Sequence, residues 1–164
     1  MATEKVRLDF ESGVFLHSLM GGDVRELGYL EEMLGLQTVT RDGWVSLEGT
    51  GEAVEAGKRV FADLEEARRG GALLSGRDFR LAVDLVAKES EQSVSRMVKV
   101  RLLGERGKKP VVPKTPGQAS YIEAMQEHDV TFGLGPAGTG KTYLAMAMAL
   151  SLLKAKEVNR VVLT

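Results

Sequence analysis

The feature that most constrains this chain is a glycine-rich loop between two apolar segments of different periodicity. Its eight residues, Gly135-Pro136-Ala137-Gly138-Thr139-Gly140-Lys141-Thr142, have the spacing GxxxxGK[ST]. The apolar run 130–134 before the loop predicts a strand, and the pattern of residues 140–155 after it predicts a helix. A further apolar run at 161–163 predicts a second strand. Strand, glycine loop, helix and strand are the opening of a parallel α/β sheet.

The residue types of this loop suit the binding of phosphate. Glycines let the backbone turn sharply so that successive N–H groups point at phosphate oxygens, and the helix that follows adds its positive N-terminal end. We expect Lys141 to bridge the β- and γ-phosphates and the Thr142 hydroxyl to hold Mg²⁺. The predicted ligands are therefore a nucleoside triphosphate and Mg²⁺. All eight loop residues are predicted nucleotide contacts, Thr142 is the predicted metal contact, and Lys141 is the one catalytic residue that this chain offers.

Composition removes several other classes of protein. The chain has no cysteine, which excludes a disulfide framework, a thiolate metal site and a cysteine nucleophile. Residues 1–11 are charged and lack the apolar core of a secretion signal. The longest apolar stretch, 144–153, is far shorter than the ~20 residues of a membrane span. We therefore expect a cytoplasmic protein with no membrane partner.

Charge is distributed unevenly along the chain. The net charge is −1, but residues 1–70 carry −6 and residues 96–114 carry +6. The whole-chain charge thus gives no sign of nucleic-acid binding. The basic stretch has two interpretations, a solvated linker or a phosphate-binding strip, and the linker is favoured.

The first seventy residues predict a compact unit of order β-α-α-β-β-α. Val6, Leu8 and Phe10 alternate with polar residues, as in a half-buried strand, and Asp42-Gly43 is a strong hairpin signal. The predicted elements are, in order, a strand at 5–10, helices at 14–20 and 23–34, strands at 36–40 and 44–48, and a helix at 50–69.

A connecting region and a second domain follow. Residues 75–88 predict a helix that begins with a Ser75-x-x-Asp78 capping box. Residues 97–103 and 111–112 predict two short strands, and 117–127 predicts a helix. The predicted domains are therefore 1–70, a helix with a basic connecting segment at 71–114, and the start of a nucleotide-binding domain at 115–164.

Two segments together resemble a known family. Residues 115–121, TPGQASY, and 132–145, FGLGPAGTGKTYLA, closely resemble the PhoH-like family of phosphate-starvation-inducible ATPases. The resemblance implies a KH-like α+β domain at the N-terminus, followed by the beginning of a helicase-like α/β P-loop NTPase domain. It also implies that Gln118 reads the adenine edge, for which a side-chain amide has both a donor and an acceptor. The alternative is a glutamine at a helix start that faces water.

The KH-like part gives weak support for RNA as a partner. A KH module clamps nucleic acid with a GxxG loop, but the corresponding segment here is Gly21-Gly22-Asp23-Val24-Arg25. Arg25 replaces the second glycine, and Asp23 would repel a phosphate. A structural or protein-docking role is therefore favoured over RNA binding. The face of the hairpin on which Trp44 lies, and hence whether it could stack on a base, is left open by the pattern.

The sequence after the loop has no carboxylate to complete a metal site. A P-loop ATPase also needs an acidic residue at the end of another strand, and no Asp or Glu follows Glu157. The chain therefore resembles the N-terminal portion of a longer protein. The complete protein is expected to be an ATPase, with a homo-oligomeric state left open by the sequence, and we do not expect this chain alone to turn over ATP. The alternatives are a fragment of a nucleic-acid helicase, or a KH-like binding module with an inert ATPase remnant.

Overall fold

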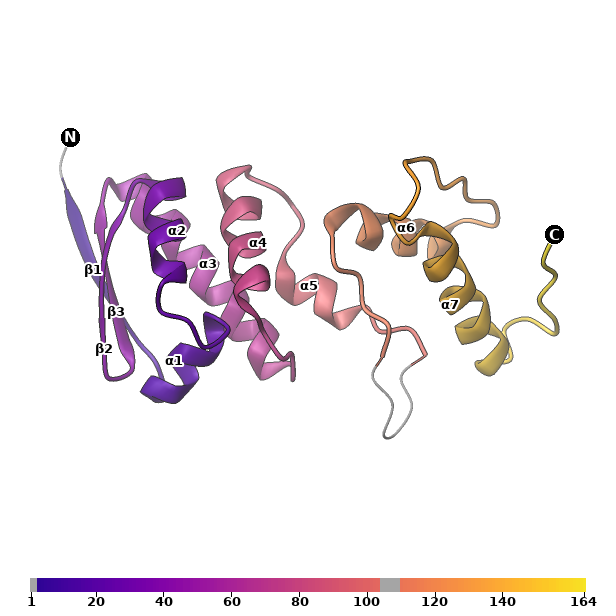
Figure 1. Cartoon of the computed structure of the whole chain (residues 1–164), viewed down its shortest axis with the longest axis horizontal. Helices are drawn as coiled ribbons and strands as arrows, with labels where there is room; N and C mark the ends of the chain where they lie inside the picture. The colour runs from indigo at the N-terminus through magenta and orange to yellow at the C-terminus, as the bar shows by residue number, and fades with distance from the viewer. Residues whose placement is uncertain (1–2, 104–109) are drawn as a thin grey trace. The chain divides into compact units, whose positions relative to one another are not determined.

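The computed structural model describes residues 3–103 and 110–164. The chain divides into two compact units, Met1–Arg96 and Met97–Thr164, whose elements are labelled in Figure 1. The predicted domain limits at residues 70 and 114 stay a prediction. None of the helices in the described ranges is long and apolar enough to span a membrane.

The first unit is built on a three-stranded antiparallel sheet of order β1-β3-β2. Its strands are β1 (Glu4–Asp9), β2 (Gln37–Arg41) and β3 (Trp44–Gly49). Val6 lies opposite Leu47 in the β1–β3 pairing. Because opposite residues share a face, the alternating pattern gives the sheet one apolar side, and that side packs against a helix. The β2–β3 turn places Gly43 at φ 90°, the left-handed conformation that the Asp-Gly signal predicts.

Four helices complete this unit and confirm the predicted order. They are α1 (Gly13–Leu19), α2 (Glu26–Leu34), α3 (Gly51–Arg69) and α4 (Gly76–Ala87). The hydroxyls of Ser12 and Thr50 accept the N–H groups that the starts of α1 and α3 leave unpaired. The capping box at the start of α4 is present. Helix α2 begins at Glu26 and not near Asp23, because the Asp23 carboxylate holds Arg25 in a turn.

Three aromatic rings run through the core of the first unit. The ring centroids of Phe10 and Phe61 are 5.7 Å apart, and those of Phe61 and Phe79 are 6.1 Å apart. These rings join the end of β1 to α3 and α4. The apolar side chains of α3 that recur at helical spacing are buried. Helix α4 packs against α2 and α3, where Arg80 pairs with Glu26 at 2.7 Å.

The predicted strand at 97–103 is wrong over its first part. Residues Val94–Lys99 form the short helix α5, whose first N–H groups, those of Val94 and Ser95, are accepted by the Asp63 carboxylate at 2.8 and 2.9 Å. This cap comes from a residue about thirty positions earlier, so no local pattern could have shown it. One antiparallel bridge, Leu102 with Val111, is all that the described residues retain of the two predicted strands. Residues 104–109 of the basic stretch lie outside the described residues.

The second unit contains two longer helices, α6 (Pro116–Glu127) and α7 (Lys141–Lys154), which confirm the predictions at 117–127 and 140–155. They pack on each other. Their shared core consists of five buried side chains: Leu102, Ile122, Leu144, Ala147 and Met148.

The predicted parallel strands at 130–134 and 161–163 are wrong. Neither segment belongs to a strand, and the sheet of the first unit is the one sheet in the part of the chain that the structure describes. The side chain of Phe132 is 84% exposed and that of Leu134 is 92% exposed. A strand exists through hydrogen bonds to a neighbouring strand, and neither segment has such a neighbour here. The observed architecture is therefore mixed α+β, without the parallel P-loop sheet.

Candidate nucleotide-binding site

The glycine-rich loop joins the end of the 130–134 segment to the N-terminus of α7. Three of its glycines have positive φ: 152° at Gly135, 77° at Gly138 and 85° at Gly140. A Cβ atom on Gly135 or Gly138 would meet nothing within 4 Å. These two positions therefore need glycine for its backbone conformation and not for lack of space. Gly140 is the residue before the first turn of α7, so the loop leads directly into a helix N-terminus.

The side chain of Lys141 folds back into this loop. Its Nζ donates to the carbonyl oxygens of Gly135 at 2.9 Å and Pro136 at 2.6 Å, and to Oγ1 of Thr139 at 3.2 Å. The Thr139 hydroxyl in turn donates to the Pro136 carbonyl at 3.0 Å. The loop is thus curled around an ammonium group at the positive end of a helix, an arrangement that favours an anion.

Thr142 is exposed in the first turn of α7. Within residues 3–103 and 110–164, no group of three or more His, Cys, Asp and Glu side chains could hold a metal ion. Mg²⁺ commonly keeps several waters and takes one or two protein ligands beside substrate phosphates. The Thr142 hydroxyl fits that limited role, with the phosphates and water as the remaining ligands.

A cavity of about 450 Å³ lies between α6 and the loop, within the usual size range of small-molecule pockets. Its lining includes Gln118, Phe132 and Lys141. Tyr121 also lines the cavity, but its ring is so close to Gly133 that a Cβ there would lie 3.1 Å from it. Tyr121 is also packed against the core of this unit, so its ring is used in packing.

The side chain of Gln118, on α6, contacts the backbone of the loop and does not face open solvent. Its Oε1 accepts the backbone N–H of Lys114 at 2.8 Å, and its Nε2 donates to the Thr139 carbonyl at 3.1 Å. The link to Thr139 crosses 21 residues of sequence, so the sequence motif indicates a nucleotide contact for Gln118 but not these backbone partners. Its predicted role in reading adenine stays a prediction.

The Gly21-Gly22 segment of the first unit is engaged in packing. Gly21 has φ 67°, and a Cβ on it would lie 2.2 Å from the backbone nitrogen of Gly76, at the start of α4. Asp23 pairs with Arg25 at 2.7 Å. The hydrogen bonds from Arg25 lower the pKa of Asp23 to about 2. These contacts support a structural role for the segment, and weak RNA binding stays a prediction.

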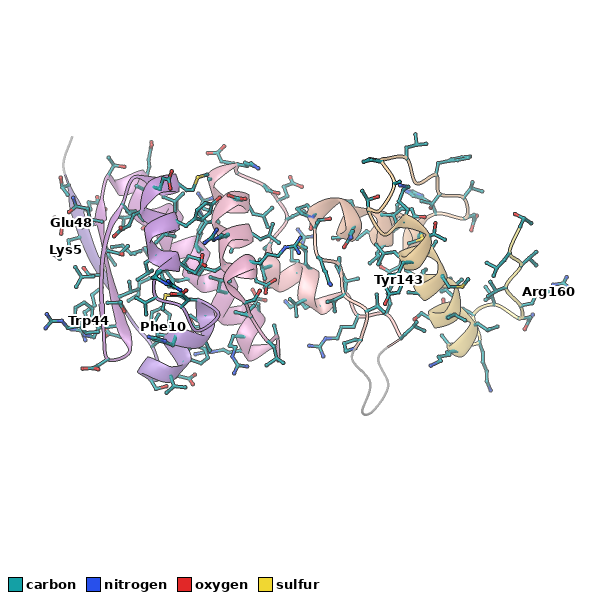
Figure 2. The ribbon with its side chains drawn as sticks, viewed as in Figure 1. Lys5, Phe10, Trp44, Glu48, Tyr143 and Arg160 are labelled. Carbon is teal, nitrogen blue, oxygen red and sulfur yellow. The ribbon has the colours of Figure 1, made fainter. Side chains whose placement is uncertain are left out.

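Trp44 lies on the sheet face opposite the helices. It pairs with Asp9 across the β1–β3 ladder and so lies on the opposite face from Val45. Figure 2 shows Trp44 on the outer side of the sheet and Phe10 on the helix side. The guanidinium carbon of Arg7 lies 4.6 Å from the Trp44 ring centroid, so this ring already has a cation–π partner within the sheet.

Comparison with known proteins identifies the family. The family model described as "PhoH-like protein" matches residues 110–164, which include α6, the loop and α7. The PhoH-like protein of Bacillus subtilis (strain 168) is 33% identical over 147 residues, covering 90% of this chain and 46% of that protein. The PhoH-like protein of Mycobacterium tuberculosis (strain H37Rv) is 35% identical over 146 residues, covering 89% of this chain and 41% of that protein.

The match extends across both units of the chain. A shorter match, to the protein PhoH of Escherichia coli (strain K12), is 31% identical over 81 residues, with 47% of this chain and 23% of that protein covered. No solved structure matches. The chain belongs to the PhoH-like family, as the two motifs predict. It spans less than half the length of the relatives named here.

Proposed function

We propose that this chain binds a nucleoside triphosphate, with ATP as the expected nucleotide, through residues 135–142. The observation that carries the proposal is the loop that curls around the Lys141 ammonium at the N-terminus of α7. Backbone N–H groups, a helix N-terminus and a lysine are the three features that bind the phosphates of nucleotides in such loops.

The parts of the site have distinct roles in this proposal. The loop backbone cradles the phosphates, while Lys141 exchanges its contacts with the Gly135 and Pro136 carbonyls for the β- and γ-phosphates. Thr142 supplies one ligand to Mg²⁺, which neutralises phosphate charge when it is bound. The adjoining cavity gives room for the rest of the nucleotide. Membership of the PhoH-like family supports an ATPase role for the complete protein.

Calorimetry with the full chain tests the proposal. Lys141→Ala should weaken Mg²⁺-ATP binding by about 10- to 100-fold, because a hydrogen bond to a charged group contributes about 1.5–3 kcal/mol. Adenosine binding should not change, because adenosine has no phosphate for Lys141 to contact. Lys154→Ala, at the far end of the same helix, is the control and should leave the ATP affinity as it is. Equal affinities of the wild type and Lys141→Ala for ATP would refute the assignment.

A further inference from the structure

The side-chain amide of Gln118 joins two backbone segments of the second unit. Gln118 is the third residue of α6, and its own N–H donates to Oγ1 of the capping residue Thr115 at 3.3 Å. From this fixed position Oε1 accepts the Lys114 N–H, and Nε2 donates to the Thr139 carbonyl. Exchange of the amide oxygen and nitrogen would set donor against donor and acceptor against acceptor, so the hydrogen-bond partners fix the orientation of the amide.

The contact with Thr139 controls a peptide group of the phosphate loop. In a trans peptide the C=O and the following N–H lie in one plane and point in opposite directions. By holding the Thr139 carbonyl, Gln118 therefore also sets the direction of the Gly140 N–H. A Cβ on Gly140 would lie 3.3 Å from Nε2 of Gln118, so glycine at this position lets the amide approach the loop closely.

We propose that Gln118 is a positioning residue for the phosphate loop and does not select the base. An amide that reads adenine presents its acceptor and its donor to one base edge, whereas the two ends of this amide hold two different parts of the backbone. The inference rests on the proposed function, because its consequence is a pre-set loop that favours triphosphates irrespective of the base. Gln118 then contributes equally to the binding of ATP, GTP and inorganic tripolyphosphate.

Calorimetry of the full chain with these three Mg²⁺-bound probes tests the ligand side of the proposal. Gln118→Ala should weaken all three by the same factor, about 3- to 10-fold for the loss of a backbone-orienting hydrogen bond. Gln118→Glu keeps an acceptor for Lys114 but cannot donate to Thr139, so it should weaken all three at least as much. Gln126→Ala, on an exposed position of the same helix, is the matched control and should change none of them.

Backbone amide NMR relaxation without ligand tests the loop directly. In both Gln118 variants the Gly140 and Lys141 amides should have lower order parameters than in Gln126→Ala, because the Thr139 carbonyl is no longer held, while the amides in the core of α6 around Ile122 keep their order parameters. That difference separates positioning of the loop from a general loss of structure. Unchanged order parameters at Gly140 would overturn the proposal.

Two further outcomes discriminate between the inference and the proposed function. A loss confined to ATP, with GTP and tripolyphosphate unaffected, would mean that Gln118 reads adenine, and the positioning role would be wrong. A wild type that binds none of the three probes would refute the proposed function, whereas the relaxation experiment would still decide whether Gln118 orders the loop.

Discussion

Gly21 and Gly22 show how neighbouring residues of one type can have different tasks. Both have positive φ, 67° and 86°, yet a Cβ would meet the Ser75-Gly76 backbone at Gly21 and nothing within 4 Å at Gly22. The Gly21 position is therefore constrained by both conformation and space. Gly21 therefore lets the α1–α2 connection pack closely against the start of α4.

Alanine at these two positions separates the constraints. Gly22→Ala should lower the free energy of unfolding by about 1–2 kcal/mol, the cost of a left-handed non-glycine residue. Gly21→Ala should lower it by about 1–3 kcal/mol more, because the backbone of α4 has to move away. Denaturant unfolding of the full chain measures both. Equal losses for the two variants would contradict the close contact with Gly76.

The Asp23 carboxyl provides a test by pH. Its pKa of about 2 is below the ordinary 3.8, chiefly through the side-chain hydrogen bonds with Arg25. Because the folded pKa is the lower one, the pair contributes stability above about pH 4 and loses it as the pH falls towards 2. An NMR titration should show the pKa rise towards 3.8 in Arg25→Ala and move much less in Arg80→Ala, since Arg80 is the smallest of the causes. An unchanged pKa in Arg25→Ala would disprove the assignment.

Local sequence patterns were sufficient to predict a helix or strand where its ends and its buried face depend on residues close in sequence. Ser75 and Asp78 form the capping box at the start of α4, and the inward spacing of Val54, Phe61 and Leu64 on α3 corresponds to buried positions. These signals depend on neighbours three or four residues apart in sequence, which explains why the β-α-α-β-β-α order could be predicted.

Elements that depend on distant partners could not be predicted in this way. Helix α5 begins where Asp63, on α3, accepts its first N–H groups, and the apolar run around it gave no sign of this cap. The runs at 130–134 and 161–163 have the composition of strands but no paired neighbour. For the site, the motif gave the loop residues, while the contacts of Gln118 with Lys114 and Thr139 required three-dimensional proximity.

Hydrogen exchange should distinguish these elements. The amides at 130–134 and 161–163 should exchange quickly, because neither segment lies in a sheet, whereas α3 and the core of α7 should exchange slowly. The exposed Phe132 and Leu134 should also make the chain self-associate as its concentration rises, which sedimentation measures. Slow exchange at 130–134 in a monomer would mean that this segment does form a protected strand.

For the whole molecule, binding and turnover of ATP are expected to separate. A P-loop ATPase needs an acidic residue beside the Thr142 hydroxyl, whereas the last acidic residue of the printed sequence, Glu157, lies beyond the opposite end of α7. The chain mixed with Mg²⁺-ATP should therefore release phosphate no faster than a protein-free control in a coupled assay. Clear hydrolysis that disappears in Thr142→Ala would show that a carboxylate elsewhere in the chain completes the site.

In the proposed function, the backbone of the glycine-rich loop binds the phosphates of a nucleotide. The most direct test of this claim is the backbone amide NMR spectrum of the isotope-labelled full chain, titrated with Mg²⁺-ATP. The largest shifts should fall on the amides of residues 137–142, with the sheet of the first unit unaffected, and inorganic tripolyphosphate should shift the same amides. Saturating ATP that leaves these amides unchanged, or that shifts chiefly residues of the first unit, would contradict the claim.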